Sequence, residues 1–163
     1  NCRPDKTPLE LIVLHNISLP PGEFGGGYIE ALFTNALNPS LHPYFESIAH
    51  LRVSAHFLVT RLGEILQFVA TDNRAWHAGE SQWCGRSNCN DFSIGIELEG
   101  TDDQTYTDIQ YLQLQKLVAV LKSHHPSLGE GDIVGHCDIA PGRKTDPGAS
   151  FDWQRLAALS NAD

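Results

Sequence analysis

The chain has 163 residues, enough to bury one compact core, and a second domain is not expected. Hydrophobic residues make up 41% and charged residues 19%, as in ordinary globular proteins, and no apolar run approaches the roughly 20 residues that span a bilayer. The formal net charge of −9 argues against nucleic-acid binding, which depends on Lys and Arg neutralising phosphates. We therefore expect a single domain over residues 1–163 with neither nucleic acid nor membrane as partner. A monomer is our further expectation, for which the composition gives no argument.

The four cysteines, Cys2, Cys84, Cys89 and Cys137, are too few for a disulfide scaffold. Reduced thiols in a cytoplasm are the simpler interpretation, although a local disulfide or half of a structural zinc site stays open for Cys84 and Cys89. Residues 1–6 lack the apolar stretch of a secretory signal, while the missing initiator methionine leaves earlier removal of a segment open. We expect a cytoplasmic protein.

The first predicted elements are strands. Residues 9–14 are apolar and partly β-branched, and they predict a buried central strand that ends at His15. Residues 57–60 and 64–69 flank a turn in which Gly63 supplies the positive φ of a tight hairpin. These two segments predict an antiparallel pair.

Another strand is predicted over residues 93–99, because two kinds of residue alternate along it. Ile94, Ile96 and Leu98 share one face, and Gly95, Glu97 and Glu99 share the other. Glu97 is thus expected to point away from the isoleucines.

The last third of the chain predicts a helix, a strand and a second helix. Residues 107–110 resemble a capping box, and apolar residues at helical spacing continue until Pro126. Residues 132–135 predict a short strand ending at His136, and residues 151–156 begin a terminal helix. The elements together predict an α/β fold with a central mixed β-sheet flanked by α-helices.

Two of the eight histidines, His15 and His136, directly follow strand-like runs, where open sheets present reactive side chains to a crevice. Catalytic zinc usually takes three ligands from His, Asp, Glu or Cys and leaves a fourth position for water. The segment 135–148 mixes such ligands with cations between glycines and prolines. Within it Lys144 lies two residues before Asp146, so both side chains can point toward one site in an extended loop.

Each of these residues also has a plainer interpretation. A single histidine near a loop is more often a capped, hydrogen-bonded residue than a ligand. An ion pair explains Lys144 and Asp146 equally well. Glu97 beside Gly95 is compatible with a solvated face, although a glycine there also allows close approach of a ligand or backbone. The pattern alone leaves these alternatives open.

Five ordered segments carry a resemblance to a known family: residues 15–22, 54–57, 75–79, 90–100 and 135–148. They resemble those of the zinc N-acetylmuramyl-L-alanine amidases related to peptidoglycan-recognition proteins, and most closely the cytoplasmic members that act in cell-wall recycling. The resemblance covers almost the whole chain and implies an amidase/peptidoglycan-recognition-protein-like fold. It also implies hydrolysis of the amide between (1,6-anhydro-)N-acetylmuramic acid and L-alanine in a small soluble muropeptide.

The resemblance implies that His15, His136 and Asp146 hold one catalytic Zn²⁺. Glu97 matches the catalytic carboxylate and Lys144 the stabilising cation. The wider family often has cysteine at the position of Asp146, but carboxylate is an accepted third zinc ligand. The candidates for substrate binding are Asn16, Tyr44, Arg52, Trp76 and His77.

Several of these candidates have alternatives. Trp76 and His77 resemble a cleft-lining pair, but buried packing of Trp76 with a hydrogen-bonded His77 fits the sequence about as well. Tyr44 falls where similar enzymes place a tyrosine near the metal. Arg52 can pair with a carboxylate of the peptide stem or form a surface salt bridge. His56 heads an apolar strand, for which a structural role is the expectation.

Two other functions compete with the amidase. A muropeptide-binding module without catalysis is typical of relatives that have lost metal ligands, whereas this sequence keeps all three candidates together with Glu97 and Lys144. A metalloprotease is disfavoured, because the motif His-Glu-x-x-His does not occur.

Overall fold

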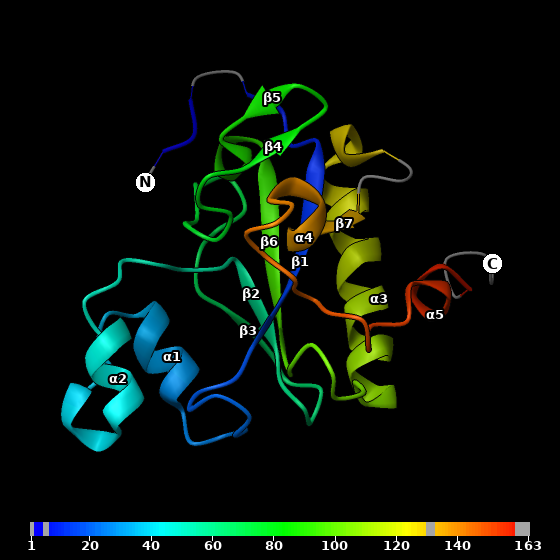
Figure 1. The fold of residues 1–163 in the computed structure, drawn as a ribbon. Coiled ribbons are helices and arrows are strands. Elements are labelled where there is room, and N and C mark those ends of the chain that lie inside the picture. The colour runs from blue at the N-terminus through cyan, green and yellow to red at the C-terminus, as the bar shows by residue number, and fades with distance from the viewer. Residues whose placement is uncertain (1, 5–6, 130–132, 159–163) are drawn as a thin grey trace.

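The computed structural model describes residues 2–4, 7–129 and 133–158. Its centre is a five-stranded mixed sheet with the order β3-β2-β6-β1-β7 (Figure 1). The strands are β1 (Leu11–Ile17), β2 (Phe57–Val59), β3 (Ile65–Gln67), β6 (Ser93–Glu99) and β7 (Ile133–Gly135). Strands β2, β6, β1 and β7 run parallel, and β3 is antiparallel to β2. A separate hairpin pairs β4 (Gln82–Trp83) with β5 (Arg86–Ser87).

One face of the sheet is covered by the long helix α3 (Asp108–His124) (Figure 1). Alternating residues of the strands, such as Ile94 and Ile96, form a core there with Leu114 and Leu121 of α3. The capping box at Thr107 is present, which explains where the helix begins. Helix α5 (Trp153–Ala158) contacts α3 farther along the chain.

The opposite face of the sheet carries two separate apolar clusters. Along β1, Val13 belongs to one cluster with Phe92, and Ile17 packs against the other with Phe33. His15 lies between Val13 and Ile17 on the same face, because side chains alternate along a strand. The gap between the two clusters is therefore polar.

Most of the remaining helices lie near this second face. They are α1 (Tyr28–Phe33), α2 (Pro43–Ile48), α4 (His136–Ile139) and the 3₁₀ helices η1 (Pro39–Leu41) and η2 (Cys89–Asp91). The 3₁₀ helix η3 (Pro126–Leu128) contacts α3 and places Leu128 in the core on the first face. Figure 1 shows α1 and α2 side by side at the edge of the molecule. Within the described part of the chain, no helix is long and apolar enough to cross a bilayer.

The structure confirms the predicted mixed sheet, the hairpin, the strand 93–99 and the capped helix. Several boundaries were wrong: for example, β1 begins at Leu11 and not at residue 9, and α5 begins at Trp153 and not at residue 151. Strand β1 does not end at His15 but continues to Ile17, because its pairing with β6 extends that far. The segment 135–148 opens with α4, since the Asp138 carboxylate accepts from the Gly135 N–H at 2.7 Å and closes a helical turn. The predicted strand residue Asp132 lies outside the described residues, and all four cysteines are free.

Candidate active site

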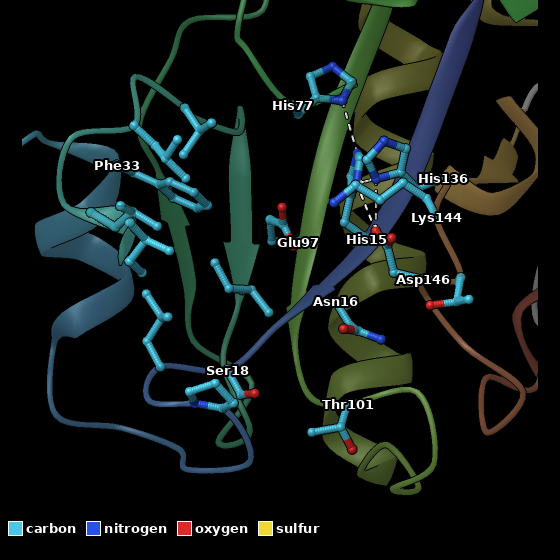
Figure 2. Close-up of a pocket in the computed structure, with 18 of the residues that line it drawn as sticks. His15, Asn16, Ser18, Phe33, His77, Glu97, Thr101, His136, Lys144 and Asp146 are labelled. Carbon is cyan, nitrogen blue, oxygen red and sulfur yellow. Dashed lines mark hydrogen bonds and ion pairs between the residues drawn. The ribbon is translucent and has the colours of Figure 1, made fainter. Parts of the chain in front are cut away.

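A cavity of about 720 Å³ opens on the polar gap between the two apolar clusters. We call one side of it the polar floor, which consists of His15, Glu97, His136, Lys144 and Asp146. We call another side the apolar wall, which consists of Leu32, Phe33, Tyr44, Ile48, Leu51 and Val53. Figure 2 shows Glu97 between the histidines of the polar floor and Phe33 of the apolar wall.

Strand register explains why residues far apart in the sequence meet on the polar floor. His15 of β1 lies directly opposite Glu97 of β6 in parallel register, so both side chains project from the same face. Strand β7 pairs with the other edge of β1 and is followed immediately by His136. The Cys137 N–H donates to the carbonyl of Asp146 at 3.0 Å, which returns the far end of this loop to its start.

His15, His136 and Asp146 form a close triangle on the polar floor (Figure 2). The Nδ1 atom of His15 lies 2.9 Å from Nδ1 of His136 and 3.1 Å from Oδ2 of Asp146. Nδ1 of His136 lies 3.0 Å from the same Oδ2 atom. Both histidines are almost fully buried, with 1% and 3% of their surface exposed, so water does not separate these groups.

The protons available to this triangle are few. Nε2 of His136 lies 3.0 Å from the Ala78 carbonyl oxygen, which can only accept, so a His136 ring with a single proton carries it on Nε2 and presents a lone pair at Nδ1. Burial lowers the pKa of His15 to about 4, and this ring is therefore neutral at pH 7. With His136 in that tautomer, at most one proton, on Nδ1 of His15, lies among the three acceptor atoms. A bound cation would satisfy all three.

The triangle fits a metal ion such as zinc. Ligand atoms about 2.0–2.1 Å from zinc in a tetrahedral site lie roughly 3.3 Å apart. The observed separations of 2.9, 3.1 and 3.0 Å are close to this value. Two histidines and a carboxylate are also a known ligand set that leaves the fourth position open. The donor atoms and their spacing are thus compatible with a metal site.

Glu97 is a buried carboxyl group, one oxygen of which has no hydrogen-bond partner among the described residues. Burial raises the pKa of Glu97 well above its usual value, the charge of Asp146 raises it further, and the Lys144 ammonium opposes both. Its Oε2 atom is buried and has no hydrogen-bond partner among the residues that the structure describes. A buried polar atom without a partner costs about 1–3 kcal/mol, and in a cavity it marks a position for a ligand or water.

The other predicted residues take different places. Asn16, Tyr44 and Trp76 line the cavity. Trp76 is 47% exposed with Arg74 stacked over its ring, so the alternative of a buried Trp76 is wrong. Asn16 donates from Nδ2 to Asp102 at 2.7 Å and to the Pro147 carbonyl at 3.1 Å, which orients its amide.

Two further candidates for substrate binding, Arg52 and His77, form hydrogen bonds with other residues of the protein. Arg52 donates to the side chain of Asn35 at 2.8 Å and does not line the cavity. His77 borders the cavity, but both of its ring nitrogens contact protein atoms. His56 is fully buried and accepts from the Gly95 N–H through Nδ1, which agrees with a structural role.

Several residues of the site were missed from the sequence. Asp102 lines the cavity and holds Asn16, and Arg143 donates to the carbonyls of Ala78 and Glu80 at 2.7 and 2.6 Å. Arg143 lies within the segment 135–148, in which only its neighbour Lys144 was predicted to be the functional cation. Asp102 follows the strand that carries Glu97, a position that could have indicated it.

The fold and the site together define a class of protein: a hydrolytic enzyme built on a mixed α/β sheet, with a metal-compatible His-His-Asp cluster beside a buried carboxyl group. The chain belongs to the N-acetylmuramoyl-L-alanine amidase family, whose model matches residues 5–149.

Individual relatives agree with this assignment. The chain is 60% identical to the 1,6-anhydro-N-acetylmuramyl-L-alanine amidase AmpD of Citrobacter freundii, over 98% of this chain and 84% of that protein. It superposes on the crystal structure of a selenomethionine derivative of AmpD with a TM-score of 0.95 and 60% identity, covering 98% and 88% of the two chains. A complex of AmiD from E. coli with anhydro-N-acetylmuramic acid-L-Ala-D-γ-Glu-L-Lys gives a TM-score of 0.72 at 28% identity, covering 97% and 60%.

Proposed function

We propose that this chain is a zinc-dependent amidase that hydrolyses the amide between the lactyl group of (1,6-anhydro-)N-acetylmuramic acid and L-alanine in small soluble muropeptides. The observation that carries the proposal is the convergence of three acceptor atoms of His15, His136 and Asp146 beside the unpartnered Oε2 of Glu97. Metal-assisted hydrolysis of an amide requires ligands for the cation and a proton acceptor for the attacking water in the same cavity as the amide carbonyl.

The substrate class is supported by the relatives. AmpD of Citrobacter freundii carries the 1,6-anhydro-muramyl amidase activity in its name, and the AmiD complex contains an anhydro-muramyl tripeptide. A cavity of about 720 Å³ is of the size that binds small ligands. Release of the stem peptide from such fragments is a step of cell-wall recycling, for which a cytoplasmic location and a monomeric state stay predictions.

We assign His15, His136 and Asp146 as the zinc ligands, because their donor types and spacing match a catalytic site with one open position. Zinc bound there would lower the pKa of a water molecule to about 7 and polarise the scissile carbonyl. The residues around it must then move the proton and stabilise the charge that develops.

Glu97 has the properties of the proton carrier. Its carboxylate accepts a proton from the attacking water as the water oxygen bonds to the carbonyl carbon, and returns it to the amine of L-alanine as the C–N bond breaks. A carboxyl group whose pKa is raised by burial is suited to both halves of this exchange near neutral pH.

Lys144 has the properties of the electrostatic partner. Its ammonium group borders the cavity beside the triangle of ligands (Figure 2). The carbonyl oxygen gains negative charge when water attacks, and a cation nearby stabilises that charge more in the transition state than in the ground state.

Substrate binding is assigned to three residues that line the cavity, of which Trp76 and Tyr44 are exposed and Asn16 is partly buried. Trp76 offers a flat ring to sugar or peptide, Tyr44 lies on the apolar wall, and Asn16 presents an oriented amide. Binding of a peptide carboxylate by Arg52 stays a prediction, since Arg52 lies outside the cavity lining.

The experiment is incubation of the purified protein with an anhydro-muramyl tripeptide, followed by chromatography of the products. Free tripeptide is expected, and a chelator should stop its release until zinc is added back. A non-catalytic binding module would instead bind the muropeptide and release nothing, and release that chelator leaves unchanged would refute the zinc dependence.

A further inference from the structure

His77 occupies a position behind one of the proposed zinc ligands. Its Nδ1 atom lies 2.9 Å from Nε2 of His15, and its Nε2 atom lies 3.2 Å from the hydroxyl oxygen of Ser93. Figure 2 shows the ring of His77 next to His15, on the side away from Asp146. Both nitrogens of His77 are thus engaged by the protein.

The direction of these hydrogen bonds follows from the last bond in the series, which Ser93 makes with Cys89. The Ser93 hydroxyl lies 2.6 Å from the carbonyl oxygen of Cys89, which can only accept, so Ser93 donates its proton there. Ser93 then accepts from Nε2–H of His77. The neutral ring of His77 has its lone pair on Nδ1, and this atom accepts from Nε2–H of His15. Consequently, Nδ1 of neutral His15 carries no proton and faces the triangle as a lone pair.

We propose that His77 is a positioning residue, which holds His15 in the tautomer and orientation that zinc binding requires, and that Ser93 fixes His77 in turn. The proposal rests on the zinc site proposed above. The hydrogen bond made by one ring nitrogen of a histidine decides which nitrogen is free to bind a metal. His77 therefore acts through His15 and does not contact the reacting atoms.

The surrounding structure supports this role from three sides. The residue after His77 orients the other ligand histidine, since the Ala78 carbonyl accepts from Nε2 of His136 at 3.0 Å. The side-chain oxygen of buried Asn90 accepts from the backbone N–H groups of His77 and Ala78 at 3.0 and 2.9 Å, which fixes both residues. At position 95 a Cβ atom would overlap the His77 ring, so the glycine of β6 makes the room for it.

A pair of variants of nearly equal shape tests the proposal. His77→Asn places an amide oxygen about where Nδ1 lies and keeps an acceptor for His15, whereas His77→Leu fills the same space without one. Zinc affinity is measured by competition with a chromophoric chelator, with thermal unfolding as the check of folding. We expect His77→Leu to weaken zinc binding about 10- to 100-fold, the usual effect of losing such a partner, and His77→Asn to stay within about threefold of the unchanged protein.

A spectroscopic measurement keeps the proposal testable even if His77→Leu does not fold. Long-range ¹H–¹⁵N spectra of the zinc-free, unchanged protein should show His15 with its proton on Nε2, and a proton on Nδ1 would overturn the proposal. Equal zinc affinity of His77→Leu and the unchanged protein, or an equal loss in His77→Leu and His77→Asn, would overturn it too. An unchanged protein that binds no zinc at all would refute the proposed metal site itself.

Discussion

The polar floor and the apolar wall of the cavity are built in different ways. The polar floor rests on neighbouring parallel strands and one loop, so register fixes His15 opposite Glu97 and His136 beside them. The apolar wall comes from the six-residue helices α1 and α2 and the segment that follows them. The sheet thus holds the groups that need exact mutual placement for chemistry, while short surface helices supply area for binding. Changes to the polar floor should lower kcat, and changes to the apolar wall should raise KM.

The largest effect on turnover is expected for Glu97→Gln. The amide cannot accept the water proton, so kcat should fall about 10²- to 10⁴-fold with zinc content unchanged. The midpoint of thermal unfolding should not fall, because burial disfavours the ionised form of Glu97 and the amide is neutral. Glu99→Gln, on the same strand face, is the control: Glu99 accepts from the Arg61 N–H and should affect stability more than kcat. Full kcat in Glu97→Gln would remove it from the mechanism.

The second-largest fall in kcat is expected for Lys144→Ala. Losing the cation beside the carbonyl oxygen is expected to lower kcat about 10²- to 10³-fold, as loss of one oxyanion partner does. The side chain is exposed, so zinc content and stability should be unchanged. Lys116→Ala, an exposed lysine of α3, serves as the control and should leave kcat as it was. An equal kcat in both variants would contradict the proposed role.

His56, which accepts a hydrogen bond from Gly95 of β6, should contribute to the pH dependence of the free energy of unfolding. Burial lowers the pKa of His56 to about 4, from 6.5 in the unfolded chain. Between these values the unfolded state binds a proton that the folded state does not, so stability is full above pH 6.5 and is lost as pH falls toward 4. His56 alone should account for about 3 kcal/mol of this loss. Urea unfolding in chelator should show a decline smaller by this amount in His56→Asn than in the unchanged protein, and equal declines would contradict the prediction.

The smallest effect is expected on the apolar wall. Leu51→Ala removes part of a half-exposed side chain, and the lost apolar contact should raise KM about tenfold while kcat stays within about twofold. Leu62→Ala is the matched control, because Leu62 is 81% exposed and lies outside the cavity. A fall in kcat for Leu51→Ala with unchanged KM would break the distinction between the polar floor and the apolar wall.

The same difference explains what could be predicted from the sequence. Strand β6 was predicted with its full bounds because its alternation is regular, and Glu97 was assigned to the correct face. Helices α1 and α2 were not predicted, since six residues hold less than two turns of periodicity. The N-cap residue of α1 is Gly27, which has no side chain to cap the helix, so the usual sequence signal was missing.

The ligand histidines and their supports differ in the same way. His15 and His136 follow apolar runs, which are a local signal in the sequence. The contact of His77 with His15 joins residues 62 positions apart, and no local pattern predicts it. The one local signal for His77 was Gly95, because a glycine in a strand allows a neighbouring group to approach closely. The neighbour is the imidazole of His77, and only the folded chain identifies it.

Zinc content of the purified protein and its ligand variants tests the central claim most directly. We expect about one zinc per chain in the unchanged protein, and loss of nearly all zinc in His15→Ala, His136→Ala and Asp146→Ala. His124→Ala, at the exposed end of α3, should keep the full amount. Full zinc retention in the three ligand variants would contradict the site described for the polar floor.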